Sequence, residues 1–471
     1  MRLYANLYNV LITSLAFLCL FTAFQTTCLV SQNVLESSAL TSGKPTGDAF
    51  LSLAVLYASL AALNWIAPLL VIAVGERIAM FLGACCYVIY VSVFMFPKDW
   101  LLYSASVLNG FGAAVLWTAQ GTYITRCSDD YTINRHFSMF WSIFQTSQIW
   151  GGLYAYFTLA GITQIETSMR YRLIGALVAI GAVGWFLFLA LRKPEEQYDS
   201  NSTLDAFKVE LDYEVSAVEE EIEPAGCHVL WKSSADAFLR SFVLLRTRMM
   251  VCIMVVSGFT GVIATFHLVL LSTCIGHTLA FGEKTKSYIG LAGVFIGSGE
   301  VVGGTLMHLR RWIPSTGLVS IFGFVSALGG AVILLLVLPL DSPMKPTTSL
   351  GFLPPDVSLC MLASFLLGVS GSVWNTQICS LIGLVYGPRG VDVPVAFSMY
   401  KCLQAICTAL SSSYSGYLQL HWQLLIFCIF TCAALVCFLW AHWKYTQDVK
   451  TEVIKNGSSK HHEDNGSLYS D

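Results

Sequence analysis

Charged residues are scarce in this chain. Only 12% of its 471 residues are Asp, Glu, Lys or Arg, against roughly a quarter in an average soluble domain. The charges of the 26 basic and 29 acidic residues nearly cancel, which excludes the excess of positive charge that is typical of a nucleic-acid-binding protein. Hydrophobic residues make up 55%, and the mean hydropathy is +0.66. These proportions predict a polytopic membrane protein whose surroundings are the lipid bilayer.

Motifs of enzymes and of metal or cofactor sites are also lacking. The sequence has no Walker loop, no HExxH, no GxSxG and no CxxC pair. Fifteen cysteines are present, but most lie within apolar runs, where cysteine is a small packing residue. We therefore expect no enzyme activity, no cofactor, no resident metal and no structural disulfide.

Twelve stretches are apolar and long enough to cross a membrane as helices, a crossing that takes about 20 residues. Each stretch is continuously apolar, whereas the strands of a membrane barrel alternate. The first is too long for a signal peptide and lacks a small-residue cleavage site. The predicted spans are 7–30, 49–74, 78–97, 101–124, 137–161, 173–191, 249–274, 287–309, 316–340, 358–385, 396–419 and 423–443.

The distribution of basic residues between the loops predicts the orientation. With both termini in the cytoplasm, 18 Lys and Arg lie on that side and seven on the other, as the positive-inside rule requires. The sequons at Asn201, Asn456 and Asn465 then face the cytoplasm, and we expect them to be unused. The sequence does not distinguish the plasma membrane from an endolysosomal membrane.

A change of composition divides the apolar spans into two sets. Between 192 and 248, twelve acidic residues stand against seven basic ones. We interpret this segment as a cytoplasmic acidic linker between an N-terminal six-helix half at 1–191 and a C-terminal half at 249–443. A cytoplasmic tail follows at 444–471.

The end of the linker has a helical pattern. Phe238, Phe242 and Leu245 share one helical face, with three arginines nearby. Two interpretations remain open: an amphipathic helix on the inner membrane surface, or a simple spacer with a basic stop.

The two halves contain a weak internal repeat. Trp117-Thr-Ala-Gln120 in the fourth span corresponds to Trp374-Asn-Thr-Gln377 in the tenth, and each is followed by a Phe-Ser-Met triplet, at 137–139 and at 397–399. Six plus six helices in parallel repeat are typical of the major facilitator superfamily. The predicted fold is therefore an all-α major facilitator fold of 12 transmembrane helices.

Several segments, taken in order, resemble the Unc-93-like family of this superfamily. They are Phe21-Thr-Ala-Phe-Gln25, Val115-Leu-Trp-Thr-Ala-Gln-Gly121, Cys274-Ile-Gly276, Ile289-Gly-Leu-Ala-Gly-Val-Phe-Ile-Gly297 and His421-Trp-Gln-Leu-Leu425. The resemblance covers nearly all the spans and weakens in the linker and tail. It implies a transporter fold, and also association with potassium-channel regulation or receptor escort. Where the related pattern has an Asp before a Ser and Asn-Thr-Gln, this chain has Gly371.

Uncharged polar and aromatic side chains form the first candidate site. The first, fourth, seventh and tenth spans line the central cavity in the superfamily that the chain resembles. An aromatic wall with a few amides suits a small organic solute, whereas hydrogen bonds between helices would explain the same residues. The substrate-cavity candidates are Gln25, Asn109, Trp117, Gln120, His267, Trp374, Asn375 and Gln377.

Two charges inside predicted spans form a second candidate set, because a charge within the bilayer is costly. Glu300 stands ten residues before Arg310, about 15 Å along a helix and hence near the midplane. It is a candidate proton carrier for coupling, or a carboxyl group hydrogen-bonded to the neighbouring half. Lys401 contacts a substrate or extends to the cytoplasmic interface.

Charged loop residues are candidates for gating. Gly75-Glu76-Arg77 closes the loop between spans 2 and 3, and Arg310 and Arg311 occupy the matching loop between spans 8 and 9. They form ion pairs that break during alternating access, or they are topological anchors.

Two functions fit these observations. The first is a secondary transporter that moves a small organic solute by alternating access, with coupling to protons. The second is a non-transporting partner that regulates or escorts another membrane protein, such as an ion channel or a receptor. The fold alone does not decide between them.

Overall fold

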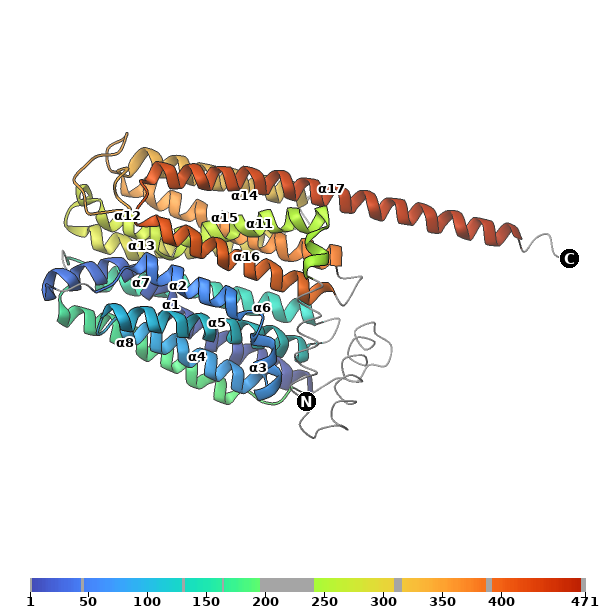
Figure 1. Cartoon of the computed structure of the whole chain (residues 1–471), viewed down its shortest axis with the longest axis horizontal. Helices are drawn as coiled ribbons and strands as arrows, with labels where there is room; N and C mark the ends of the chain where they lie inside the picture. Colours follow the sequence, from blue (N-terminus) through green and yellow to red (C-terminus); the bar gives the residue numbers. More distant parts are fainter. Residues whose placement is uncertain are drawn as a thin grey trace.

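The computed structural model describes residues 2–43, 46–128, 132–162, 165–194, 241–308, 316–386 and 392–466. Nearly all of these residues are helical, in two groups that follow the order of the chain. Figure 1 shows the N-terminal group, in blue to green, lying against the C-terminal group, in yellow to red. Residues 195–240 of the predicted linker, with Phe238, lie outside the described residues.

The N-terminal half begins with a single long helix, α1, and continues through shorter ones. Its elements are α1 (Arg2–Ser42), α2 (Ala49–Leu63), α3 (Ala67–Val74), α4 (Glu76–Val93), α5 (Asp99–Arg126), α6 (Ile133–Gln145), α7 (Ser147–Thr158), α8 (Thr167–Leu187) and η1 (Phe188–Ala190).

The C-terminal half begins with a helix that is interrupted by a π-helical segment, η2. Its elements are α11 (Arg248–Thr265), η2 (Phe266–Leu270), α12 (Leu271–His277), η3 (Leu279–Lys284), α13 (Thr285–His308), α14 (Thr316–Val337), α15 (Val357–Tyr386), α16 (Asp392–Ser415) and α17 (Leu420–Gly466).

Every predicted span coincides with a helix or an interrupted helix. Eight helical stretches of the described chain are by themselves long and apolar enough to cross a membrane. The other four predicted spans are the interrupted pairs α2–α3 and α6–α7, the glycine-rich α13, and α16. The number of twelve crossings therefore stays a prediction.

The span from 137 to 161 is interrupted at one residue. The Thr146 hydroxyl donates to the Ile143 carbonyl over 2.8 Å, and the Thr146 amide also turns back to this oxygen, over 3.2 Å. A side chain that competes for the helical carbonyls bends a helix. The sequence analysis predicted one continuous helix here, and the division into α6 and α7 corrects it.

The first and last predicted spans are shorter than the helices that contain them. α1 continues to Ser42 instead of ending at 30, and α17 continues to Gly466, through most of the predicted tail. In Figure 1, α17 projects far beyond the bundle at the end where α1 begins. We call the opposite end of the bundle the distal end.

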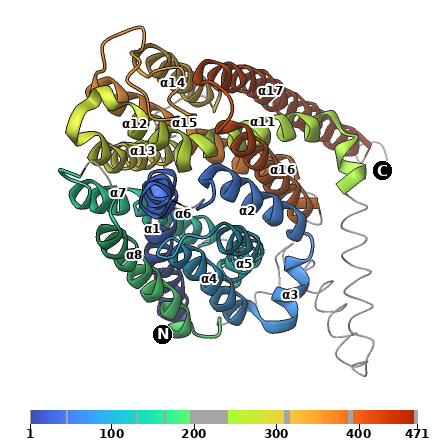
Figure 2. The same ribbon diagram turned by 60° about the vertical axis from the view of Figure 1, so that its left-hand side comes forward.

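Glycines bring the two halves into close contact. α7 packs on α13, and α2 packs on α16, as Figure 2 shows from another side. A Cβ built on Gly290 would lie 2.6 Å from the Gly152 carbonyl, and one on Gly152 would lie 2.7 Å from the Gly290 carbonyl. No side chain fits between these backbones, so α7 and α13 meet directly.

The second glycine face of α13 packs within the C-terminal half. A Cβ on Gly303 would lie 2.5 Å from the Val369 carbonyl, and one on Gly299 would lie 2.8 Å from the Val369 amide. The glycines of α13 thus meet α7 on one face and α15 on the other, and both neighbours belong to the same chain.

The predicted amphipathic helix is described only at its end. Residues 241–245 are helical, with Phe242 and Leu245 exposed and Leu244 buried. Its location at the membrane surface stays a prediction.

Candidate functional site

Glu300 faces a histidine of the same half. The Oε1 atom of Glu300, on α13, lies 3.3 Å from Nδ1 of His267, and the two side chains are only 19% and 11% exposed. His267 belongs to the π-helical segment η2, a form that occurs mostly as local bulges, often at functional sites. A carboxyl group and an imidazole therefore meet in the interior of the C-terminal bundle.

The contact made by the second ring nitrogen of His267 determines which nitrogen carries a proton. Nε2 lies 3.0 Å from the Leu367 carbonyl oxygen, which only accepts hydrogen bonds, so Nε2 carries a proton. The contact between Nδ1 and Glu300 is then attractive only when one further proton is present, on the imidazole or on the carboxyl group. The geometry thus commits Nε2 to the Leu367 carbonyl and leaves Nδ1 facing the Glu300 carboxyl group.

Space for the imidazole comes from a glycine on α15. A Cβ on Gly371 would lie 3.2 Å from Nε2 of His267 and closer still to Cε1. A side chain at this position would therefore displace the ring. A side chain at position 371 and the imidazole of His267 therefore cannot occupy this volume at the same time.

A polar network extends from Gly371 to Lys401. The Asn375 amide donates to the Gly371 carbonyl over 2.9 Å, and its Oδ1 accepts from the Tyr400 hydroxyl over 2.7 Å and from the Gln404 amide over 3.1 Å. The Lys401 ammonium group donates to Gln404 over 3.0 Å and lies 4.7 Å from the centre of the Tyr400 ring. Two predicted site residues, Asn375 and Lys401, are thus brought together.

Lys401 and Glu300 do not form an ion pair with each other. Glu300 pairs with His267, and Lys401 has the neutral partners Gln404 and Tyr400. Within the described part of the chain, no carboxylate lies within ion-pair distance of the Lys401 ammonium group. Its partners among the described residues are thus two neutral side chains, Gln404 and Tyr400.

Two cavity candidates of the N-terminal half are partly accessible. Gln25, on α1, accepts a hydrogen bond of 2.6 Å from the Ser147 hydroxyl on α7. Trp117, on α5, stacks on Trp141 with ring centroids 5.9 Å apart and meets Phe21 edge-on. Both are half-buried.

Four other candidates are buried in this conformation. Asn109, Trp374 and Gln377 are 0% exposed, and Gln120 is 4% exposed. Trp374 packs edge-on against Phe259 and Phe438 inside the C-terminal half. These four side chains lie in helix–helix packing here, and their exposure to a cavity in another conformation stays a prediction.

The gating candidates are only partly described. Glu76 forms an ion pair of 2.7 Å with Arg126, and Arg77 donates to the Leu191 carbonyl over 3.2 Å. Both contacts join helices of the N-terminal half rather than the two halves. Arg310 and Arg311 lie outside the described residues, so a gating pair between the halves stays a prediction. Sequence analysis did not include Arg126 in this set.

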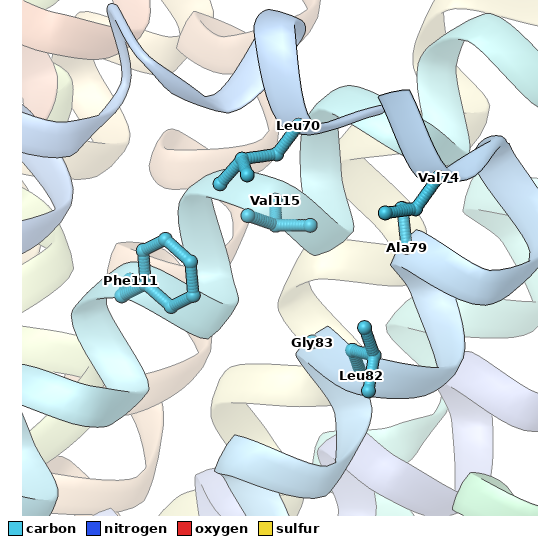
Figure 3. Close-up of a pocket in the computed structure, with 7 residues that line it drawn as sticks. All are labelled: Leu70, Val74, Ala79, Leu82, Gly83, Phe111 and Val115. Atoms are coloured by element: carbon cyan, nitrogen blue, oxygen red, sulfur yellow. The ribbon is translucent and has the colours of Figure 1, made fainter. Parts of the chain in front are cut away.

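An apolar pocket lies between α3, α4 and α5 (Figure 3). Leu70, Val74, Leu82, Phe111 and Val115 contribute to its lining, which is entirely apolar. A binding site for a polar solute needs a few placed polar groups, so this pocket is not a second candidate for one. Within the described residues, no group of three His, Cys, Asp or Glu side chains gathers as metal ligands would.

Comparison with known proteins identifies the family. The family model described as "Ion channel regulatory protein UNC-93" matches residues 45–439. The chain is 36% identical over 447 residues to the UNC93-like protein MFSD11 of Xenopus laevis, covering 94% of this chain and 97% of that protein. The chain belongs to the UNC-93 family. It is also 26% identical to protein unc-93 homolog A of Mus musculus, over 89% of this chain and 90% of that protein.

Solved structures show that this UNC-93 protein has the major facilitator fold. A D-xylose–proton symporter superposes with a TM-score of 0.61 at 11% identity, covering 93% of this chain and 97% of that one. A peptide transporter POT in complex with sulfate gives a TM-score of 0.61 at 15% identity, covering 93% and 94%. At these identities, the likeness concerns the fold alone.

A second carboxyl–imidazole pair was missed by sequence analysis. At the distal end, Oε2 of Glu36 lies 2.7 Å from Nε2 of His277, and this contact joins α1 to α12. Both residues lie beyond the ends of the predicted spans, so they were treated as loop residues. Glu36 would have stood out as a charge inside an apolar helix only if the first span had been extended to Ser42.

Proposed function

We propose that the chain is a secondary transporter that moves a small organic solute by alternating access, with Glu300 and His267 as its proton-coupling pair. One observation carries this proposal: the largely enclosed Glu300 carboxyl group and the His267 imidazole face each other over 3.3 Å, and the other ring nitrogen lies against a carbonyl oxygen. A group that must gain or lose one proton inside a helix bundle is suited to coupling.

The polar network beside this pair supports a solute site. Asn375, Gln404 and the uncompensated Lys401 offer donors and acceptors on α15 and α16. Gln25 and Trp117 contribute an amide and an aromatic face from the N-terminal half. Such a combination favours a small solute with a carboxylate or several hydroxyl groups.

Flux measurements in proteoliposomes test the proposal. The purified chain, reconstituted with an inward proton gradient, is offered amino acids, sugars, nucleosides and organic acids, and internal pH is followed with a trapped dye. We expect solute uptake accompanied by internal acidification. Glu300→Gln should abolish the proton movement, whereas Glu283→Gln, which removes an exposed carboxylate of η3, should retain it.

Two outcomes would contradict the transporter. One is the lack of flux for every class of solute from protein that is folded by thermal-unfolding criteria. The other is unchanged proton coupling in Glu300→Gln.

A regulatory partner is the second candidate, and the extension of α17 favours it. This helix continues to Gly466, beyond the bundle (Figure 1), and the matching family model is described as an ion channel regulatory protein. The glycine faces of α13 do not support this candidate, because α7 and α15 already cover them. Stable co-purification with one membrane protein, lost on deletion of residues 449–471 and accompanied by no flux, would favour the regulator.

A further inference from the structure

The distal end of the bundle is held by a contact between the two halves. Glu36 lies near the end of α1 and His277 at the end of α12, and their side chains meet at 2.7 Å. His277 is fully buried, whereas the Glu36 side chain is 28% exposed. Solvent at the distal end therefore reaches one partner of a contact that is otherwise enclosed.

Hydrogen-bond geometry fixes the number of protons in this contact. The other ring nitrogen of His277, Nδ1, lies 2.8 Å from the Ser342 carbonyl oxygen, so Nδ1 must carry a proton. At 2.7 Å, a second proton must lie between Nε2 and the Glu36 carboxyl group. Without it, a nitrogen lone pair would face a carboxylate, and the contact would be repulsive.

Other polar groups position the pair. Gln32, one turn before Glu36, donates to Glu36 over 2.8 Å and accepts from the Ala49 amide over 3.0 Å. Lys286, at the start of α13, donates to Asn33 on α1 and attracts the Glu36 carboxylate. The Lys286–Asn33 hydrogen bond is a second contact between the two halves, and it does not involve a histidine.

The remaining charged neighbour is Asp48, the N-cap of α2. Burial raises the pKa of the Asp48 carboxyl group, and the nearby Glu36 carboxylate adds to this effect. Among the residues that the structure describes, the titratable and charged groups that act on the contact are thus Lys286 from α13 and Asp48 from the loop before α2.

We infer that Glu36 and His277 form a proton-binding latch, in which one proton taken up from the distal side joins the two halves and closes that end of the protein. Loss of the proton replaces a charge-assisted hydrogen bond with repulsion, so the distal ends separate as pH rises. The latch rests on the proposed alternating access, but it lies apart from the Glu300–His267 pair and requires no bound solute.

Distance measurement between the halves tests the latch without transport. Spin-labelled unnatural amino acids at Lys98 and Leu350, both exposed, avoid the fifteen native cysteines. Double electron–electron resonance in nanodiscs then gives the closed and open populations from neutral to alkaline pH. Because one proton is involved, the closed-to-open ratio should fall by no more than about tenfold per pH unit.

Substitutions at the latch separate its parts. In His277→Gln, the amide can donate to Glu36 at any pH, so the distal end should stay closed and lose its pH dependence. In Glu36→Ala, the contact is gone, so the open population should dominate throughout. His421→Gln, a matched loss of another imidazole near the distal end, should behave as the unmodified chain does.

Further variants test whether another titratable group causes the pH dependence of the distance. The pH dependence should survive in Lys286→Gln, Asp48→Asn and His267→Gln. A pH-independent distance in the unmodified chain, or full pH dependence in His277→Gln, would overturn the latch. The two proposals fail in different ways. If the chain is not a transporter, the distance still changes with pH but no solute is moved; if the latch is wrong, the distance does not change with pH in the way described.

Discussion

Gly371 lies directly against the imidazole of His267. A Cβ at position 371 would come within 3.2 Å of Nε2 and nearer to Cε1, so the glycine permits the orientation in which the ring meets both Glu300 and the Leu367 carbonyl. The absence of a side chain at position 371 and the contact between Glu300 and His267 are therefore parts of one arrangement.

Gly371→Ala should therefore destabilise the C-terminal half and separate His267 from Glu300. Overpacking of this kind costs about 1–3 kcal/mol, which thermal unfolding in detergent detects as a lower melting temperature. Gly383→Ala, on the same helix, is the matched control, because nothing lies within 4 Å of its added Cβ. Equal melting temperatures for the two variants would show that the ring moves aside freely.

The helical spans and the position of Glu300 inside one of them could be predicted from the sequence, because apolar runs long enough to cross a bilayer form helices and a charge within such a run stands out. The partner of Glu300 could not be predicted. The π-helical segment η2 changes the helical register around His267, and hydropathy contains no information on which helices pack together. The weak repeat of Trp and Gln indicated equivalent positions, but Trp374 and Gln377 are buried, whereas Trp117 is half-exposed.

Gly290→Leu should weaken the contact between the two halves. The α7 and α13 backbones approach so closely that a Cβ on Gly290 would lie 2.6 Å from the Gly152 carbonyl, and a leucine must force the helices apart. We expect a lower melting temperature and loss of monodisperse behaviour in size-exclusion chromatography. Gly121→Leu, on α5, has open space around its Cβ and should leave both properties unchanged.

Asn375→Ala should remove the centre of the network around Lys401. Its Oδ1 accepts from both Tyr400 and Gln404, and a donor left buried without an acceptor costs about 1–3 kcal/mol. Asn375→Asp keeps the acceptor, and its protonated carboxyl group can donate to the Gly371 carbonyl as the amide did, so this variant should retain most of the thermal stability. If the alanine variant is as stable as the aspartate variant, the network contributes nothing to the fold.

The distal latch shows a second limit of sequence analysis. Glu36 and His277 were not among the candidates because the first and seventh predicted spans end at 30 and 274, whereas α1 continues to Ser42 and the seventh helical run to His277. Polar residues at the ends of apolar runs can still lie inside the bundle when the partner half covers them. Only the packing of α1 against α12 and α13 brings these residues together.

The orientation itself can be tested by glycosylation. If both termini are cytoplasmic, the sequons at Asn201, Asn456 and Asn465 are out of reach of the lumenal transferase, and expression in mammalian cells should give a band that endoglycosidase does not shift. The double variant Leu350→Asn with Phe352→Thr creates an Asn-Gly-Thr sequon in the exposed distal loop and should add one removable glycan. A removable glycan on the unmodified chain, lost in Asn201→Gln, would reverse the topology. The proton for the latch would then come from the cytoplasm, because the Glu36–His277 contact lies at the end of the bundle opposite the linker.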